Sequence, residues 1–121
     1  KLPCAPTIRY PDYMFCCQEH VVLLEVDEHE HVNYNPQCEI ARIFEIMDSI
    51  DLKCLHVIRY NPHSRGLSAT QRKQHIIDTI RTVMNKNLAQ FNDSGCIVQY
   101  VGYSEDRVRL LEDLSCQLQT Q

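Results

Sequence analysis

Short apolar runs alternate with apolar residues at helical spacing along the chain. The runs are rich in β-branched and aromatic residues and predict strands at 13–17, 21–27, 55–60 and 96–103. The run at 21–27 is apolar on both faces, which is typical of a strand buried inside a sheet. We therefore expect a sheet with this segment in its interior.

Three stretches with helical periodicity predict helices between and after these strands. The first begins at Asn35-Pro36, a favourable N-cap and first-turn pair. The second begins at Ser68, which forms a capping-box pattern with Gln71, and the third follows Ser104. The three apolar stripes are Ile40, Ile43, Phe44, Met47 and Ile50; Ile76, Ile77, Ile80, Val83, Met84 and Leu88; and Leu111, Leu114 and Leu118.

The resulting order is strand, strand, helix, strand, helix, strand, helix. This order predicts an α/β fold with a central mixed four-stranded sheet flanked by helices.

A length of 121 residues, with 44% hydrophobic and 23% charged residues, fits one domain over 1–121. No apolar run approaches the roughly 20 residues that cross a bilayer. No secretion signal is recognised, so an intracellular location, cytoplasmic or nuclear, is expected. The first residue is Lys1, which suggests a fragment or a processed product.

Charge is distributed unevenly, although the net charge is only −4. Residues 11–50 contain nine acidic residues and one basic residue, whereas residues 51–90 contain seven basic residues and two acidic ones. Such halves can hold a cation beside a polyanion, or they can be two solvated faces that happen to differ.

Seven cysteines are present, with no C-x-x-C pair. Without a secretion signal, reduced thiols are expected rather than a disulfide framework. Cys54 and Cys96 lie in or beside apolar runs and are expected to be buried. Zinc bound by cysteine and histidine is a further hypothesis that no ligand spacing supports.

Acidic residues converge where two predicted strands meet. Asp12 precedes the first strand and Glu25 lies near the end of the second, so a hairpin would place them together. Clustered carboxylates need a positive partner, and magnesium, which prefers oxygen ligands, could also use the Val26 carbonyl. His29 and His31 follow, and either could act as a general base on a water near the metal. The alternative is a solvated acidic loop.

Four motifs occur in an order that resembles very-short-patch-repair-like endonucleases of the PD-(D/E)xK, restriction-endonuclease-like superfamily. They are Y-P-D-Y at 10–13, E-V-D-E-H-E-H at 25–31, E-x-x-R at 39–42 and V-I-R-Y-N-P at 57–62. They are most similar to a branch with R-P-D, E-V-D-G-x-Q-H, D-x-x-R and V-L-R-F. The resemblance covers about residues 8–90. It implies a restriction-endonuclease-like fold, DNA as the substrate and Mg²⁺ or Mn²⁺ as the cofactor.

The resemblance also implies roles for individual residues. Asp12 and Glu25 would be metal ligands, Asp27 a further acidic site residue, and His31 the motif histidine. Glu39 and Arg42 would form a helix-borne pair near the site.

The chain departs from the pattern at several positions. Asp27 stands where the superfamily usually has lysine, so His29, His31 or Arg42 would have to supply positive charge or a proton. Relatives carry an N-terminal helix, and we expect this chain to lack it. These departures motivate a second hypothesis, a catalytically inactive relative that binds nucleic acid or a protein partner.

Basic residues after Pro62 are the candidates for contact with DNA phosphates. Arg65, Arg72 and Lys73 lie in the loop and first turns of the second helix; the alternative is an ordinary polar helix face. Arg59 could reach the site from its strand or form a salt bridge. The expected positions of the other histidines are the protein interior for His56 and the surface for His20 and His75.

Overall fold

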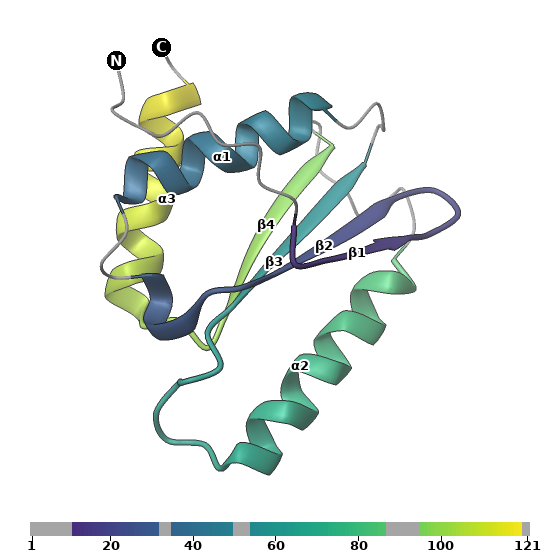
Figure 1. The fold of residues 1–121 in the computed structure, drawn as a ribbon, viewed down its shortest axis with the longest axis vertical. Helices are drawn as coiled ribbons and strands as arrows, with labels where there is room; N and C mark the ends of the chain where they lie inside the picture. The colour runs from purple at the N-terminus through teal and green to yellow at the C-terminus, as the bar shows by residue number, and fades with distance from the viewer. Residues whose placement is uncertain (1–10, 32–34, 50–53, 87–94, 120–121) are drawn as a thin grey trace.

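A computed structural model describes residues 11–31, 35–49, 54–86 and 95–119 (Figure 1). Its elements are β1 (Tyr13–Cys16), β2 (Val21–Val26), the 3-10 helix η1 (Glu28–His31), α1 (Pro36–Ser49), β3 (Leu55–Tyr60), α2 (Ala69–Met84), β4 (Cys96–Val101) and α3 (Glu105–Gln119). The α/β class and the element order are confirmed, with strand ends within two residues of the predicted ones.

The four strands form one mixed sheet in the order β1-β2-β3-β4. β1 and β2 form an antiparallel hairpin in which Tyr13 is opposite Leu24. β2, β3 and β4 run parallel, so their carboxyl ends lie at the same edge of the sheet. The row Glu25, Arg59 and Tyr100 crosses the sheet near that edge.

Helices cover both faces of the sheet. α1 and α3 pack together on one face, whereas α2 crosses the other (Figure 1). The core between the sheet and α1 contains Val21, Leu23, Ile43, Ile46, Leu55 and Val57. The core between the sheet and α2 contains Val22, Leu24, Ile58, Ile76, Val83 and Val101. The alternation along β2 explains why its run is apolar on both faces.

Side-chain caps fix the helix starts where the sequence predicts them. Ser68 and Gln71 form the capping box of α2, with each side chain bonded to the other residue's backbone N–H. At α1, Asn35 Oδ1 accepts from the Gln37 N–H at 2.9 Å. At α3, Ser104 Oγ accepts from the Arg107 N–H at 3.3 Å. All three starts follow from local sequence.

Two expectations are wrong. His20 is only 3% exposed, because its Nε2 lies 2.8 Å from the Val83 carbonyl of α2. Cys38 is disulfide-bonded, although reduced thiols were expected, whereas Cys16, Cys17, Cys54, Cys96 and Cys116 are free.

Three expectations about burial are met in whole or in part. His56 is buried, and its Nε2 is 2.8 Å from Gln99 Oε1, as expected of an interior histidine. His75 is exposed on α2. Cys54 is buried, and Cys96 is partly buried against the core. Among the described residues, no helix is long and apolar enough to span a bilayer.

Candidate functional site

The hairpin brings Asp12 and Glu25 to the same corner of the sheet. The last pair of the hairpin is Tyr13 with Leu24, and Asp12 lies in the bend immediately before β1. Side chains alternate between faces along a strand, and those directly opposite share a face. Glu25 therefore shares the face of Val21 and Leu23, which α1 covers, and the Asp12 charge acts on Glu25.

A backbone contact holds Asp12 at this corner. The Val26 N–H donates to Asp12 Oδ2 at 2.7 Å. The N–H and C=O of a strand residue point to the same side, so the Val26 carbonyl faces the side on which Asp12 lies. Asp12 itself is exposed, so solvent reaches this corner at its carboxylate.

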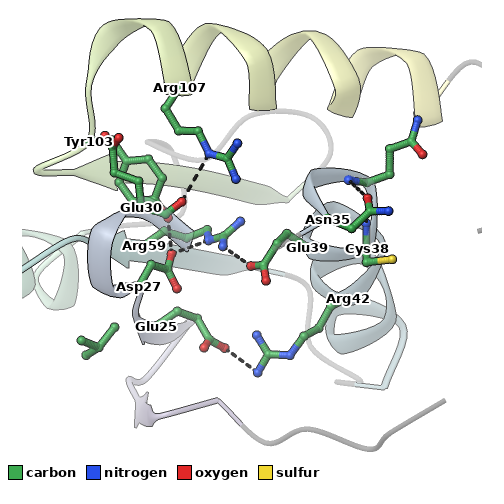
Figure 2. A network of polar contacts seen from close by, with 12 residues as sticks. Glu25, Asp27, Glu30, Asn35, Cys38, Glu39, Arg42, Arg59, Tyr103 and Arg107 are labelled. Atoms are coloured by element: carbon green, nitrogen blue, oxygen red, sulfur yellow. Dashed lines mark hydrogen bonds and ion pairs between the residues drawn. The ribbon is translucent and has the colours of Figure 1, made fainter. Parts of the chain in front are cut away.

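Glu25 lies deeper, at the point where the apolar core under α1 gives way to charged residues. Its side chain forms an ion pair with Arg42, with Nη2 and Oε1 3.2 Å apart (Figure 2). Burial raises the pKa of Glu25; Arg42 opposes this change, and the charges of Asp12 and Asp27 add to it. Burial therefore disfavours the ionised form of Glu25 more than Arg42 favours it.

Arg59 is the centre of the neighbouring buried network. It is 2% exposed, and its guanidinium binds Asp27 through Nε at 2.7 Å and Glu39 through Nη2 (Figure 2). The Tyr103 hydroxyl donates to Asp27 Oδ2 at 2.5 Å. Burial lowers the pKa of Arg59, but Asp27, Tyr103 and Glu39 outweigh that effect, and the net pKa is raised. Burial and the nearby Asp27 raise the pKa of Tyr103, so the phenol keeps its proton and remains a donor.

Carboxylates and guanidinium groups of the described residues meet at this corner. The carboxylates are those of Asp12, Glu25, Asp27 and Glu39, and the guanidinium groups are those of Arg42 and Arg59. Within the described ranges, no group of three or more His, Cys, Asp or Glu side chains is arranged to hold a metal. The predicted ligand set has only two carboxylates and a carbonyl, and magnesium usually keeps several waters.

The segment after Asp27 adopts an unusual backbone. His29 and Glu30 have φ angles of 54° and 60°, the left-handed region that costs a non-glycine residue about 1–2 kcal/mol. The carboxylate of Glu30 accepts from the Ser104 N–H and from Ser104 Oγ. Arg107 Nε donates to the Glu30 carbonyl (Figure 2). These contacts tie the segment to the start of α3. His31 ends η1, and its side chain lies outside the described residues.

A cleft of about 650 Å³ opens beside this segment, at the carboxyl ends of β3 and β4. Arg65 and Arg72 line it, as do several residues that sequence analysis did not assign to a site. Arg72 Nη1 also donates to the Leu67 carbonyl at 2.6 Å and so shapes the loop. Lys73 is exposed on α2 and is not part of the lining. The lining residues are His29, Glu30, Tyr60, Asn61, His63, Ser64, Arg65, Leu67, Arg72, His75, Val101, Gly102, Tyr103 and Ser104.

The structure thus places the predicted residues in two adjoining groups. The first, the acidic corner with its arginine network, contains Asp12, Glu25, Val26, Asp27, Glu39, Arg42 and Arg59. The second, the cleft, contains His29, Arg65 and Arg72. Arg59 forms salt bridges, and its burial keeps it from direct contact with a substrate.

Sequence analysis assigned no site role to Tyr103, which joins these groups, or to Asn61, which holds segments of the cleft together. Asn61 Oδ1 accepts from the N–H groups of His29 and His63, and its Nδ2 donates to the Gly102 carbonyl. Asn61 entered the sequence analysis only as part of the V-I-R-Y-N-P motif at 57–62, without a role of its own. A polar residue at the carboxyl end of a parallel strand was the available signal.

Comparison of the chain with models of protein families, with curated proteins and with solved structures gives no match.

Proposed function

We propose that this chain is a metal-dependent nuclease domain of restriction-endonuclease-like fold that hydrolyses phosphodiester bonds in DNA. The observation that carries the proposal is that two carboxylates, those of the exposed Asp12 and the buried Glu25, lie near each other at one corner of the sheet. The resemblance to very-short-patch-repair-like endonucleases implies these two residues as ligands.

Magnesium or manganese suits this corner because of the donors and the charge. Asp12, Glu25 and the Val26 carbonyl offer three hard oxygen donors, and water would complete an octahedral set. A bound divalent cation would stabilise the ionised form of Glu25, which burial and the charges of Asp12 and Asp27 disfavour. Such a cation would polarise the phosphate of the substrate and activate a water molecule as the nucleophile.

The remaining residues have distinct roles in this proposal. Hydrolysis adds water to phosphorus, breaks one P–O ester bond and moves a proton from the water to a base; His31, or the exposed His29, is the candidate base. Asp27, at 1% exposure, acts as a positioning residue by fixing Arg59 and Tyr103. Glu39 and Arg42 hold Arg59 and Glu25 from the α1 side. Arg65, Arg72 and Lys73 would contact the DNA backbone.

The test is incubation of the protein with single- and double-stranded DNA in the presence of Mg²⁺ or Mn²⁺. We expect cleavage that chelation of the metal abolishes. Asp12→Asn and Glu25→Gln should each lower the rate more than about 100-fold, beyond the usual effect of losing a residue that only supports a ligand. The matched control is Asp113→Asn, which removes the same charge from an exposed position on α3 and should leave the rate unchanged. Cleavage that persists in Asp12→Asn combined with Glu25→Gln would refute the site.

A second candidate function is binding of nucleic acid or a protein partner without turnover. The observation that favours it is Asp27, which occupies the usual lysine position and is held in a buried ion pair. This alternative predicts salt-dependent DNA binding with no metal-stimulated cleavage. Metal-stimulated turnover by the purified protein would exclude it.

A further inference from the structure

The cleft beside η1 has the position and the size of a ligand site. It lies outside the carboxyl ends of β3 and β4, where open α/β sheets usually bind their ligands. Its volume of about 650 Å³ is within the 300–1,000 Å³ typical of small-molecule sites. A group the size of one nucleotide therefore has room to enter.

The lining of the cleft is suited to an anion. Two arginines and three histidines face it from η1, from the β3–α2 loop and from α2, and Tyr103 faces it from the β4–α3 loop. The acidic residue among the lining, Glu30, has its carboxylate engaged by the Ser104 N–H and Oγ. The basic residues are His29, His63, Arg65, Arg72 and His75. Guanidinium groups bind phosphate oxygens with paired, charge-assisted hydrogen bonds.

The walls of the cleft are held in place by partly buried hydrogen bonds and a ring contact. Asn61 joins three segments through His29, His63 and Gly102, with hydrogen bonds of 3.0–3.1 Å. The rings of His29 and His63 stack with centroids 4.2 Å apart and an angle of 8° between planes. Both left-handed residues, His29 and Glu30, lie on this wall, so an unfavourable backbone is maintained where it presents an imidazole to the cleft.

One residue joins the cleft to the acidic corner. Tyr103 lines the cleft, and its hydroxyl binds Asp27, two residues after Glu25 on the same chain segment. A group bound in the cleft would therefore lie next to the network that supports Glu25. The cleft and the acidic corner are therefore adjacent but separate sites.

We propose that the cleft binds the phosphate group of a nucleotide, as a second site beside the acidic corner. The identity of the ligand as a nucleotide rests on the proposed nuclease function, whereas the anionic character rests on the cleft itself. The phosphate can be the terminal group of a strand or an internal phosphodiester, since both present anionic oxygens to the same cations.

The experiment is a titration followed by ¹H–¹⁵N NMR, with deoxyadenosine 5′-monophosphate as the probe and a chelator present. We expect saturable shifts of the His63, Gly102 and Ser104 amides, smaller shifts of the same amides with inorganic phosphate, and none with deoxyadenosine. The double variant His63→Ala with Arg65→Ala should weaken binding about tenfold or more. Arg81→Ala, an equal loss of charge from an exposed α2 position outside the cleft, should leave affinity unchanged.

Several results would overturn the inference. The first is no shift at these amides up to about 10 mM deoxyadenosine 5′-monophosphate, which is tenfold above a 1 mM dissociation constant. The second is the same set of shifts with deoxyadenosine. The third is that Arg81→Ala weakens binding as much as the double variant does. A short oligonucleotide with and without a 5′-phosphate separates the sources. Tighter binding of the phosphorylated strand supports the cleft as a site for strand ends, and equal binding at the same amides supports it as a site for an internal phosphate.

The proposed function is tested separately. Because the titration contains no metal, shifts at these amides without any DNA cleavage would refute the nuclease and leave the phosphate site standing. Cleavage without shifts at these amides would refute the cleft alone.

Discussion

Replacement of Arg59 by methionine removes the buried cation that joins β3 to β2 and α1. Arg59 is 2% exposed and neutralises both Asp27 and Glu39, which are buried. Breaking a buried ion pair by removing one partner costs about 3–5 kcal/mol, because the other charge remains buried. Domains of this size have about 5–15 kcal/mol in total, so Arg59→Met removes a large fraction of the free energy of unfolding.

Urea denaturation followed by far-UV circular dichroism measures this loss, and the chain has no tryptophan to provide a fluorescence signal. With a slope of about 2 kcal/mol per molar urea, the midpoint should fall by about 2 M. The matched control, Arg81→Met at an exposed position on α2, should stay within about 0.5 kcal/mol of the parent protein.

The cause of the loss is separable from simple damage to packing. Adding Asp27→Asn and Glu39→Gln to Arg59→Met removes the unpaired carboxylates, so the triple variant should recover much of the lost stability. A loss under about 1 kcal/mol, or no recovery in the triple variant, would refute this reasoning.

Two further predictions concern a glycine and a glutamate. A Cβ at Gly102, where φ is +77°, would lie 2.5 Å from the Asn61 carbonyl oxygen, whereas one at Gly66, where φ is +88°, meets nothing within 4 Å. Gly66→Ala should therefore lose about 1–2 kcal/mol and Gly102→Ala at least about 1 kcal/mol more by urea denaturation; equal losses would contradict the close contact. Because burial raises the pKa of Glu25, the folded protein binds that proton more strongly than the unfolded chain. Stability should therefore fall as pH rises through the folded pKa of Glu25, by more in the parent protein than in Glu25→Gln, and parallel pH profiles would contradict the raised pKa.

Local sequence was enough to predict most of the secondary structure. The run at 21–27 became the buried strand β2 because both faces of the sheet are covered. Ser68 with Gln71 fixed the start of α2 through contacts three residues apart. Such signals depend on neighbours in the chain, so no tertiary information is needed to interpret them.

Tertiary contacts decided the features that the sequence did not reveal. His20 lies in a hairpin turn, but its ring is buried and contacts the carbonyl of Val83, which is 63 residues later in the chain. Tyr103 joins Asp27 across a separation of 76 residues, and no local pattern marks that contact.

The placement of α1 and α2 also required the structure. The steps from β2 to β3 and from β3 to β4 run in the same direction across parallel strands, yet the two helices lie on opposite faces. The two connections therefore have opposite hands, so one of them departs from the nearly universal right-handed rule.

A crystal soaked in manganese and examined for anomalous scattering tests the central claim most directly. The account predicts one peak bonded to the carboxylates of Asp12 and Glu25, on the side that the Val26 carbonyl faces. Absence of a peak at this corner, or carboxyl groups held more than about 8 Å apart, too far for one ion to bond both, would contradict it.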